Sequence, residues 1–236
     1  MTLQWGNLQG EALIAVAKDY VDFQMYLKRI IEKRRNDPTD DLISALVQMT
    51  QEGERSLSDA EIVGLMMGVI GAGHETTTNM LTLTLWQLLQ NRAQWLAICT
   101  DKALIPSAVE EGLRFDSPAP SMWRRTTREV VLAGVRIPAN ERICVQLASG
   151  NRDELAFSDP ASFDIRRKMQ PTHLAFGHGI HFCVGAALAR LEGRITFEAL
   201  ASKLPSLRLA RDFTPSFRPN PTLRFMQRLP IAWDER

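Results

Sequence analysis

The chain has 236 residues, of which 45% are hydrophobic, so it is long enough to bury one large core or two small ones. Its net charge is +1 and 23% of its residues are charged, so nothing suggests a polybasic tail for nucleic acid or for an anionic membrane surface. Three cysteines, Cys99, Cys144 and Cys183, lie far apart without a Cys-x-x-Cys pair. This spacing excludes a disulfide scaffold or a structural zinc site and favours a reducing compartment.

The sequence contains no pattern that is typical of a leader or of a membrane span. The first six residues, MTLQWG, have neither a basic region nor a hydrophobic core of signal length. The longest apolar run, residues 62–73, is about twelve residues long and too short to cross a bilayer. We therefore expect a soluble, cytoplasmic protein with no membrane or nucleic-acid partner.

The first half of the chain has the apolar spacing of helices. Residues 11–35 place apolar side chains at helical intervals and end in a basic turn, which complements the helix dipole. Ser58 and Glu61 form a capping box, which predicts the start of a long helix. The predicted helices cover residues 11–35, 41–51 and 58–90, followed by one that starts at Asn91 and one from Pro106 to about Phe115.

From Pro118 the pattern changes from helix to strand. Short strands are predicted at 130–132, 135–137 and 143–147, with turn residues between them. Residues 151–170 are irregular, and a loop of this length within a compact domain is typical of functional segments. A last helix is predicted at about 184–203. The predicted fold class is α+β, mainly helical, with a long central helix and a small β region.

One cysteine has the setting of a metal ligand. Cys183 stands at the end of a glycine-punctuated loop, residues 173–185, directly before the last predicted helix. Free backbone N–H groups and the positive end of the helix dipole favour the thiolate over the thiol there. A single thiolate cannot close a zinc site, but it suits haem iron as the only protein ligand. The alternative is a buried structural cysteine, the usual setting of a free cysteine.

The spacing Phe-x-x-Gly-x-x-x-Cys-x-Gly, present here as Phe176, Gly179, Cys183 and Gly185, resembles the haem-binding signature of the cytochrome P450 family. The resemblance implies that Cys183 ligates the iron of haem b. It also implies that Phe176, Gly177 and Gly185 lie beside the cofactor.

Residues 71–78, GAGHETTT, place two glycines, an acid and three threonines within a predicted core helix. Each glycine costs about 1 kcal/mol against alanine, which predicts a local kink that admits polar groups. Close helix packing and a solvated acid are the alternatives. The segment is similar to the oxygen-activation motif of the same family. This implies that Thr76 hydrogen-bonds bound dioxygen, that Glu75 delivers protons through water, and that Ala72 and Gly73 leave room for oxygen and substrate.

Glu111 and Arg114 lie at positions i and i+3 of a predicted helix and so share one face of it. Such a pair is usually a surface contact of little energetic value. The spacing resembles the family's Glu-x-x-Arg motif, which implies a buried ion pair that ties this helix to the loop before the cysteine. The third partner is either His178 or a polar group of residues 159–167.

Haem carries two propionates that need cationic or N–H partners. The resemblance implies Arg124 and His181 for this role, with Arg125 as the main rival of Arg124. One departure from the family pattern lies nearby, because Asn140 stands where bacterial relatives commonly carry glycine.

The resemblance covers nearly the whole chain, but only the C-terminal part of the family's fold. Residues 1–236 are therefore expected to form a single partial domain without the N-terminal helices and the substrate lid. The implied function is a haem-thiolate monooxygenase that inserts one oxygen atom from O2 into a small organic substrate. Its electrons would come from a ferredoxin or a flavoprotein. The alternative is a truncated, non-catalytic remnant that binds haem weakly or not at all.

Overall fold

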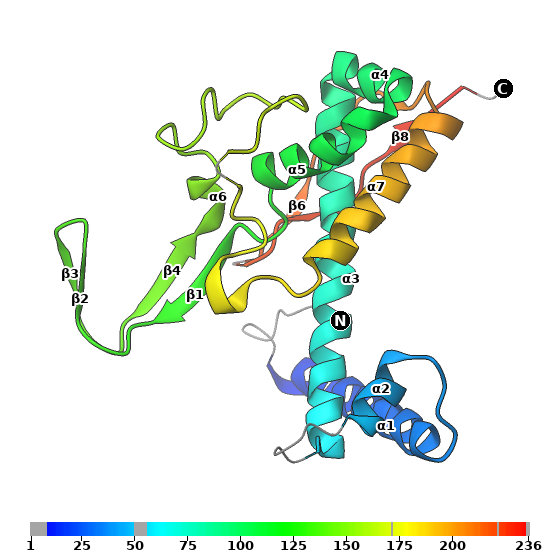
Figure 1. Cartoon of the computed structure of the whole chain (residues 1–236), viewed down its shortest axis with the longest axis vertical. Coiled ribbons are helices and arrows are strands. Elements are labelled where there is room, and N and C mark those ends of the chain that lie inside the picture. Colours follow the sequence, from blue (N-terminus) through cyan, green and yellow to red (C-terminus); the bar gives the residue numbers. More distant parts are fainter. Residues whose placement is uncertain (1–8, 50–55, 171, 221, 235–236) are drawn as a thin grey trace. The chain divides into compact units, whose positions relative to one another are not determined.

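The computed structural model describes residues 9–49, 56–170, 172–220 and 222–234. The chain divides into two compact units, Met1–His74 and Glu75–Arg236, and the long helix α3 (Asp59–Gln90) contributes residues to each. Figure 1 traces the elements in chain order. Within the described ranges, no helix is both long and apolar enough to cross a membrane.

The first unit consists of helices around a small apolar core. Helix α1 (Gly10–Asn36) and helix α2 (Leu42–Gln48) match the predicted positions, although the predicted end of α2 at residues 50 and 51 lies outside the described residues. Asp41 caps α2, since its side chain accepts a hydrogen bond from the Ser44 amide at 2.8 Å. The buried core residues are Leu27, Ile31, Leu46, Ile62 and Met66.

Helix α3 begins with the predicted capping box. The Ser58 amide donates to Glu61 Oε2 at 2.8 Å, and the Glu61 amide donates to Ser58 Oγ at 3.4 Å. The helix then continues without interruption through residues 71–78, where the sequence predicted a kink. A Cβ atom at Gly71 or Gly73 would meet no atom within 4 Å, so close helix packing does not account for these glycines.

The core of the second unit lies among helices. They are α4 (Arg92–Thr100), the 3-10 turn η2 (Lys102–Leu104), α5 (Ile105–Phe115) and α7 (Ala186–Lys203). Trp95 is fully buried, and its indole N–H donates to the Pro205 carbonyl at 3.0 Å. Further core residues are Met80, Leu88, Ile98, Ile105, Val109, Leu113, Phe163, Ile165, Phe197 and Leu207.

The strands of the described residues form small antiparallel pairs. The sequence predicted three of the four strands between residues 118 and 147 and missed β1 (Ser121–Arg125), which pairs with β4 (Arg142–Gln146). A one-turn helix, α6 (Leu147–Gly150), follows β4. The other pairs are β2 (Val130–Leu132) with β3 (Val135–Ile137), β5 (Arg208–Leu209) with β8 (Ile231–Ala232), and β6 (Phe217–Arg218) with β7 (Phe225–Met226).

Two turns in the β region require left-handed backbone. Ala133 and Gly134 have φ values of 47° and 80°, so the β2–β3 hairpin has two consecutive positive φ angles, as in a type I′ turn. Asn140 has a φ of 66°. Asparagine tolerates this region better than most residues, which explains how it replaces a glycine there.

Helix α7 lies against α5 and the adjoining part of α3 at a glycine. A Cβ atom at Gly193 would lie 3.1 Å from the methyl groups of Val109 and 3.3 Å from Met80 Cε. This close approach lies in the middle of α7, the helix that follows the loop. Figure 1 shows that loop in yellow, running through the 3-10 turn η3 (Gly179–His181) into α7.

Candidate active site

The loop before α7 folds back on itself through backbone hydrogen bonds. The Cys183 amide donates to the Phe176 carbonyl at 2.9 Å, and the Gly177 amide donates to the Leu174 carbonyl at 2.9 Å. Gly177 and Gly179 have φ values of 74° and 73°, which only glycine adopts without strain. The glycines found in the sequence therefore serve the closure of this loop, residues 173–185, which we call the cysteine loop.

Cys183 is a free, exposed thiol that lies three residues before the first residue of α7. This placement excludes the buried structural cysteine that the sequence left open. The loop side chains beside it are also exposed: Ile180 by 98% and Val184 by 97%. Two nearly fully exposed aliphatic side chains next to a thiol indicate a surface that an apolar group covers.

Cys183 as a single protein ligand fits a metal whose other ligands are supplied by a prosthetic group. Among the described residues, no group of three or more His, Cys, Asp or Glu side chains could hold a metal ion. A thiolate here would be the sole protein ligand, which is the arrangement in haem-thiolate proteins. A Cβ atom at Gly185 would lie 3.9 Å from the thiol sulfur, which is an ordinary van der Waals contact.

The acid and alcohol that the sequence predicts to activate oxygen, Glu75 and Thr76, are adjacent on α3. Glu75 and Thr76 are half-buried, and Glu75 Oε2 is a buried oxygen with no hydrogen-bond partner among the described residues. The Glu75 carbonyl accepts from Asn79 Nδ2 at 2.8 Å, and Asn79 Oδ1 accepts from the Met226 amide at 3.2 Å. A buried acceptor without a partner is costly, so Glu75 is a candidate for contact with water or a ligand.

Ala72 and Gly73 precede this pair on the same helix and are exposed. They belong to the first unit, whereas Glu75 and Thr76 belong to the second. The role that the sequence implied for Ala72 and Gly73, space for oxygen and substrate, stays a prediction.

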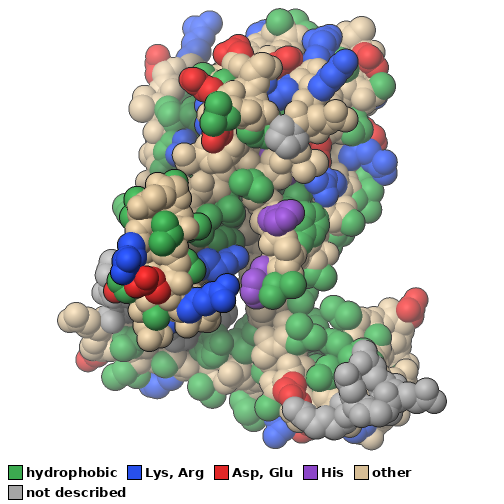
Figure 2. Space-filling model, turned by 60° about the vertical axis from the view of Figure 1, so that its left-hand side comes forward, with side chains coloured by type: hydrophobic (Ala, Val, Ile, Leu, Met, Phe, Trp, Pro, Cys, Tyr) green, Lys and Arg blue, Asp and Glu red, His purple; other side chains and the backbone are tan. Residues whose placement is uncertain are grey.

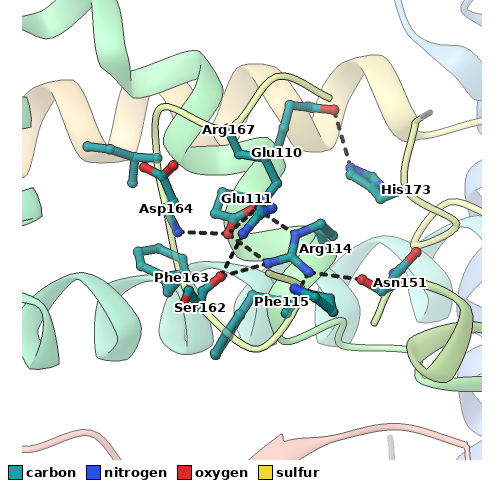
Figure 3. Close-up of polar contacts among 12 residues, drawn as sticks. Glu110, Glu111, Arg114, Phe115, Asn151, Ser162, Phe163, Asp164, Arg167 and His173 are labelled. Atoms are coloured by element: carbon teal, nitrogen blue, oxygen red, sulfur yellow. Dashed lines mark hydrogen bonds and ion pairs between the residues drawn. The ribbon is translucent and has the colours of Figure 1, made fainter. Parts of the chain in front are cut away.

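Glu111 and Arg114 form a completely buried, two-pronged ion pair on α5. Arg114 Nε donates to Glu111 Oε2 and Arg114 Nη2 donates to Glu111 Oε1, each at 2.8 Å, and both side chains have 0% exposure. The remaining guanidinium protons bind carbonyls of the long irregular segment: those of Asn151 at 2.9 Å, and of Pro160 and Ser162 at 3.0 Å (Figure 3). The pair thus fastens residues 151–162 to α5, as a buried arginine needs an acceptor for each proton.

The third partner of this pair comes from residues 159–167, one of the two alternatives. The Asp164 amide donates to Glu111 Oε1 at 2.8 Å, and Arg167 Nε lies 3.2 Å from Glu111 Oε2. His178 is exposed and takes no part in the contacts that the structure gives the pair. Residues 159–167 supply the third partner because this irregular segment passes over α5, and the Arg167 side chain extends back to the Glu111 carboxylate, as Figure 3 shows.

A second polar cluster, which the sequence did not predict, forms around Glu110, the residue of α5 just before Glu111. Arg190 of α7 binds both oxygens of Glu110, at 2.7 and 2.9 Å. The buried His173 places Nε2 3.2 Å from Glu110 Oε2 (Figure 3). Burial raises the pKa of Glu110, but the contacts with His173 and Arg190 outweigh this and lower the pKa to about 2. We call Glu110, His173 and Arg190 the Glu110 cluster.

A sequence signal for the Glu110 cluster existed but was weak. The adjacent acids Glu110 and Glu111 point about 100° apart around an α-helix, so the two carboxylates meet different neighbouring segments. His173 and Arg190 lie 63 and 80 positions from Glu110 along the chain, as their numbers show. Only the packing of α7 on α5 reveals which residues meet.

The predicted propionate partners lie at the surface. Arg124 is exposed on β1, and its Nη1 donates to the Trp123 carbonyl at 2.8 Å. His181 ends η3 and is exposed, as is Arg125. Figure 2 shows histidine side chains at the surface beside hydrophobic and basic ones. Exposed basic side chains next to apolar ones suit a ligand that has an apolar body and anionic groups at its edge. The assignment of Arg124 and His181 to the propionates stays a prediction.

The comparisons with known proteins agree with the signature of the cysteine loop. The family model "Cytochrome P450" matches residues 9–94 and 102–204. The curated relatives include Cytochrome P450 107B1 of Saccharopolyspora erythraea, which is 40% identical over 96% of this chain and 56% of its own length. They also include Cytochrome P450 monooxygenase PikC of Streptomyces venezuelae, 42% identical over 88% of this chain and 50% of its own length.

Solved structures agree in fold. CYP109E1 from Bacillus megaterium, in complex with testosterone, superimposes with a TM-score of 0.89 at 36% identity, covering 93% of this chain and 60% of that chain. The chain spans about half the length of the curated relatives it matches. On the family match, which covers most of its residues, this chain belongs to the cytochrome P450 family, whose cofactor is haem.

Proposed function

We propose that this chain carries the haem-binding and oxygen-activating part of a monooxygenase. The observation that supports this best is the exposed Cys183 thiol at the end of a closed loop, with Ile180 and Val184 uncovered beside it. The proposed cofactor is haem b with Cys183 as its axial ligand. When bound there, thiolate-ligated haem supplies the chemistry that activates O2 and inserts one oxygen atom into an organic substrate.

The residues of this chain have separate proposed roles around that cofactor. Cys183 holds the metal, while Phe176, Gly177 and Gly185 form the surface of the loop against the cofactor. Arg124 and His181 bind its propionates. The half-buried Glu75 carboxyl group relays protons to water, and Thr76 offers a hydroxyl beside it.

The substrate, electron donor and location are proposed from the family alone. We propose a small organic substrate and a ferredoxin or a flavoprotein as the donor of two electrons. We also propose that residues 1–236 form one partial domain of the family's fold, since the family match extends over both compact units. A cytoplasmic location is proposed because three free cysteines fit a reducing compartment.

The experiment is reconstitution of the purified chain with haem, followed by the absorption spectrum of the reduced, carbon-monoxide-bound form. We expect a thiolate-type Soret band in the wild type and no such band in Cys183→Ala. Cys144→Ala is the matched control, because Cys144 is a half-buried cysteine on β4, and this variant should keep the band. Absence of haem uptake by the wild type would contradict the proposal and favour the non-catalytic remnant.

A further inference from the structure

The Glu110 cluster already includes His173, the first residue of the cysteine loop, and it contacts the loop again at the ring of Phe176. The Arg190 guanidinium carbon lies 4.6 Å from the centroid of the Phe176 ring, within the range of a cation–π contact. The same ring lies 5.8 Å from the His173 ring and 6.3 Å from the Phe182 ring. Phe176 therefore has a cation and two other rings around it, although the residue is only half-buried.

The backbone of Phe176 holds the thiol-bearing residue. Its carbonyl accepts the hydrogen bond from the Cys183 amide at 2.9 Å. A continuous path of contacts thus runs from the Glu110 carboxylate through the Arg190 guanidinium and the Phe176 ring to the Cys183 amide. Each step is local, but the two ends lie on α5 and on the loop before α7.

The charges along this path favour the same arrangement. Hydrogen bonding to Glu110 raises the pKa of Arg190 most, burial opposes this, and the negative charge of Glu110 adds to the increase. Glu110 stays ionised above its lowered pKa, so Arg190 has an anionic partner across the neutral range.

We propose that Arg190 is a positioning residue for Cys183, which acts by stacking its guanidinium, clamped by Glu110, on the ring of Phe176. The inference rests on the proposed function only in that Cys183 is the ligand to be positioned. Planarity matters here, because the guanidinium can bind the carboxylate edge-on and stack face-on at once, which a lysine ammonium cannot do. Arg190 thereby holds the conformation of the cysteine loop without contacting the Cys183 sulfur.

The test is a double-mutant cycle between Arg190 and Phe176 on the whole chain without haem. The variants are Arg190→Met, Phe176→Leu and the double variant, and the measurement is hydrogen exchange at the Cys183 amide. A partly exposed cation–π contact of about 1 kcal/mol corresponds to roughly fivefold faster exchange when it is lost. We expect each single variant to show about this acceleration, and the double variant to be no faster than the faster single one.

The controls separate positioning from general stability. Arg194→Met removes an arginine one turn further along α7, whose Nε is 3.8 Å from Glu198, and should leave the Cys183 amide unchanged. The amide of Thr126, bonded to the Glu141 carbonyl in the β region, reports on opening elsewhere in the same unit. Arg190→Lys keeps the charge but loses the stacking, so it should fall between wild type and Arg190→Met.

Two results would overturn the proposal. One is multiplication of the two single effects in the double variant, which would mean that Arg190 and Phe176 act independently. The other is equal acceleration at Cys183 and Thr126, which would mean that Arg190 only stabilises the unit. If Arg190→Met prevents folding, the same cycle with Arg190→Lys decides the question. None of these readouts depends on haem, so failure of the inference and failure of the proposed function are distinguishable.

Discussion

Gly112 on α5 and Thr84 on α3 approach so closely that a Cβ atom at position 112 would lie 2.1 Å from Thr84 Oγ1. Gly112 lies between Glu111 and Arg114, so the absence of a side chain there lets α5 press against α3 at the buried ion pair. Helix α3 carries Glu75 and helix α5 carries the ion pair, and the two helices are in close contact at Gly112, a residue with no side chain to take part in chemistry.

The first prediction follows from this contact. Gly112→Ala should destabilise the chain by about 2 kcal/mol, because overpacking a full core costs about 1–3 kcal/mol and Thr84 is itself fully buried. Urea unfolding measures the change. Gly68→Ala in α3, where a Cβ meets no atom within 4 Å, is the control and should be neutral or stabilising. Equal effects of both substitutions would refute the steric argument.

The second prediction concerns the buried ion pair. Glu111→Gln leaves Arg114 charged and fully buried with one anionic partner fewer, so we expect a loss of about 3–5 kcal/mol in the free energy of unfolding. Glu129→Gln is the control, since Glu129 faces Arg136 at 3.5 Å on the exposed surface and should cost below about 0.5 kcal/mol. A small loss in Glu111→Gln would mean that the pair contributes little to stability.

The third prediction is a pH dependence from Glu110. Its folded pKa of about 2 lies below the ordinary 4.5, so its stabilisation is present above pH 4.5 and is lost as the pH falls through 2. A shift of this size corresponds to about 3 kcal/mol, which solvent screening of the partly exposed pair reduces to about 1 kcal/mol. Unfolding of wild type and Glu110→Gln should therefore differ at pH 7 and converge toward pH 2. A difference that does not change with pH would exclude this origin.

The fourth prediction has the opposite sign. Burial raises the pKa of Asp116, and the nearby Arg224, Gln87 and Arg152 do not fully offset it. The ionised carboxylate is therefore less favourable in the folded chain than in the unfolded one, so its ionisation lowers stability at neutral pH. Asp116→Asn should be at least as stable as wild type at pH 7, with its advantage shrinking on acidification. An Asn variant that loses more stability at pH 7 than at pH 3 would contradict this.

The fifth prediction separates proton delivery from haem binding. Glu75→Gln should leave haem uptake unchanged and lower substrate oxidation by about 10²-fold, the lower range for loss of a general acid. Thr82→Val is a control on the same helix, because the Thr82 hydroxyl is bonded to the Thr78 carbonyl at 2.8 Å and has no proposed chemical role. Equal oxidation rates in wild type and Glu75→Gln would remove Glu75 from the reaction.

Helix positions were predictable because their signals are local. The capping box at Ser58 and Glu61 and the apolar spacing of residues 11–35 placed α3 and α1 within two residues of their observed ends. Strand β1 was missed because its sequence, SMWRR, has no clear alternation of polar and apolar residues. It becomes a strand through pairing with β4, a partner about twenty residues away.

The sequence by itself determined the family signature, the cysteine loop before a helix, and the adjacent acid and alcohol at Glu75 and Thr76. These features depend on neighbours along the chain and on backbone that only glycine adopts. The tertiary structure alone decided that Asp164 and Arg167, rather than His178, complete the pair of Glu111 and Arg114. A buried guanidinium must find an acceptor for every proton, and which carbonyls lie within reach depends on how distant segments pack over α5.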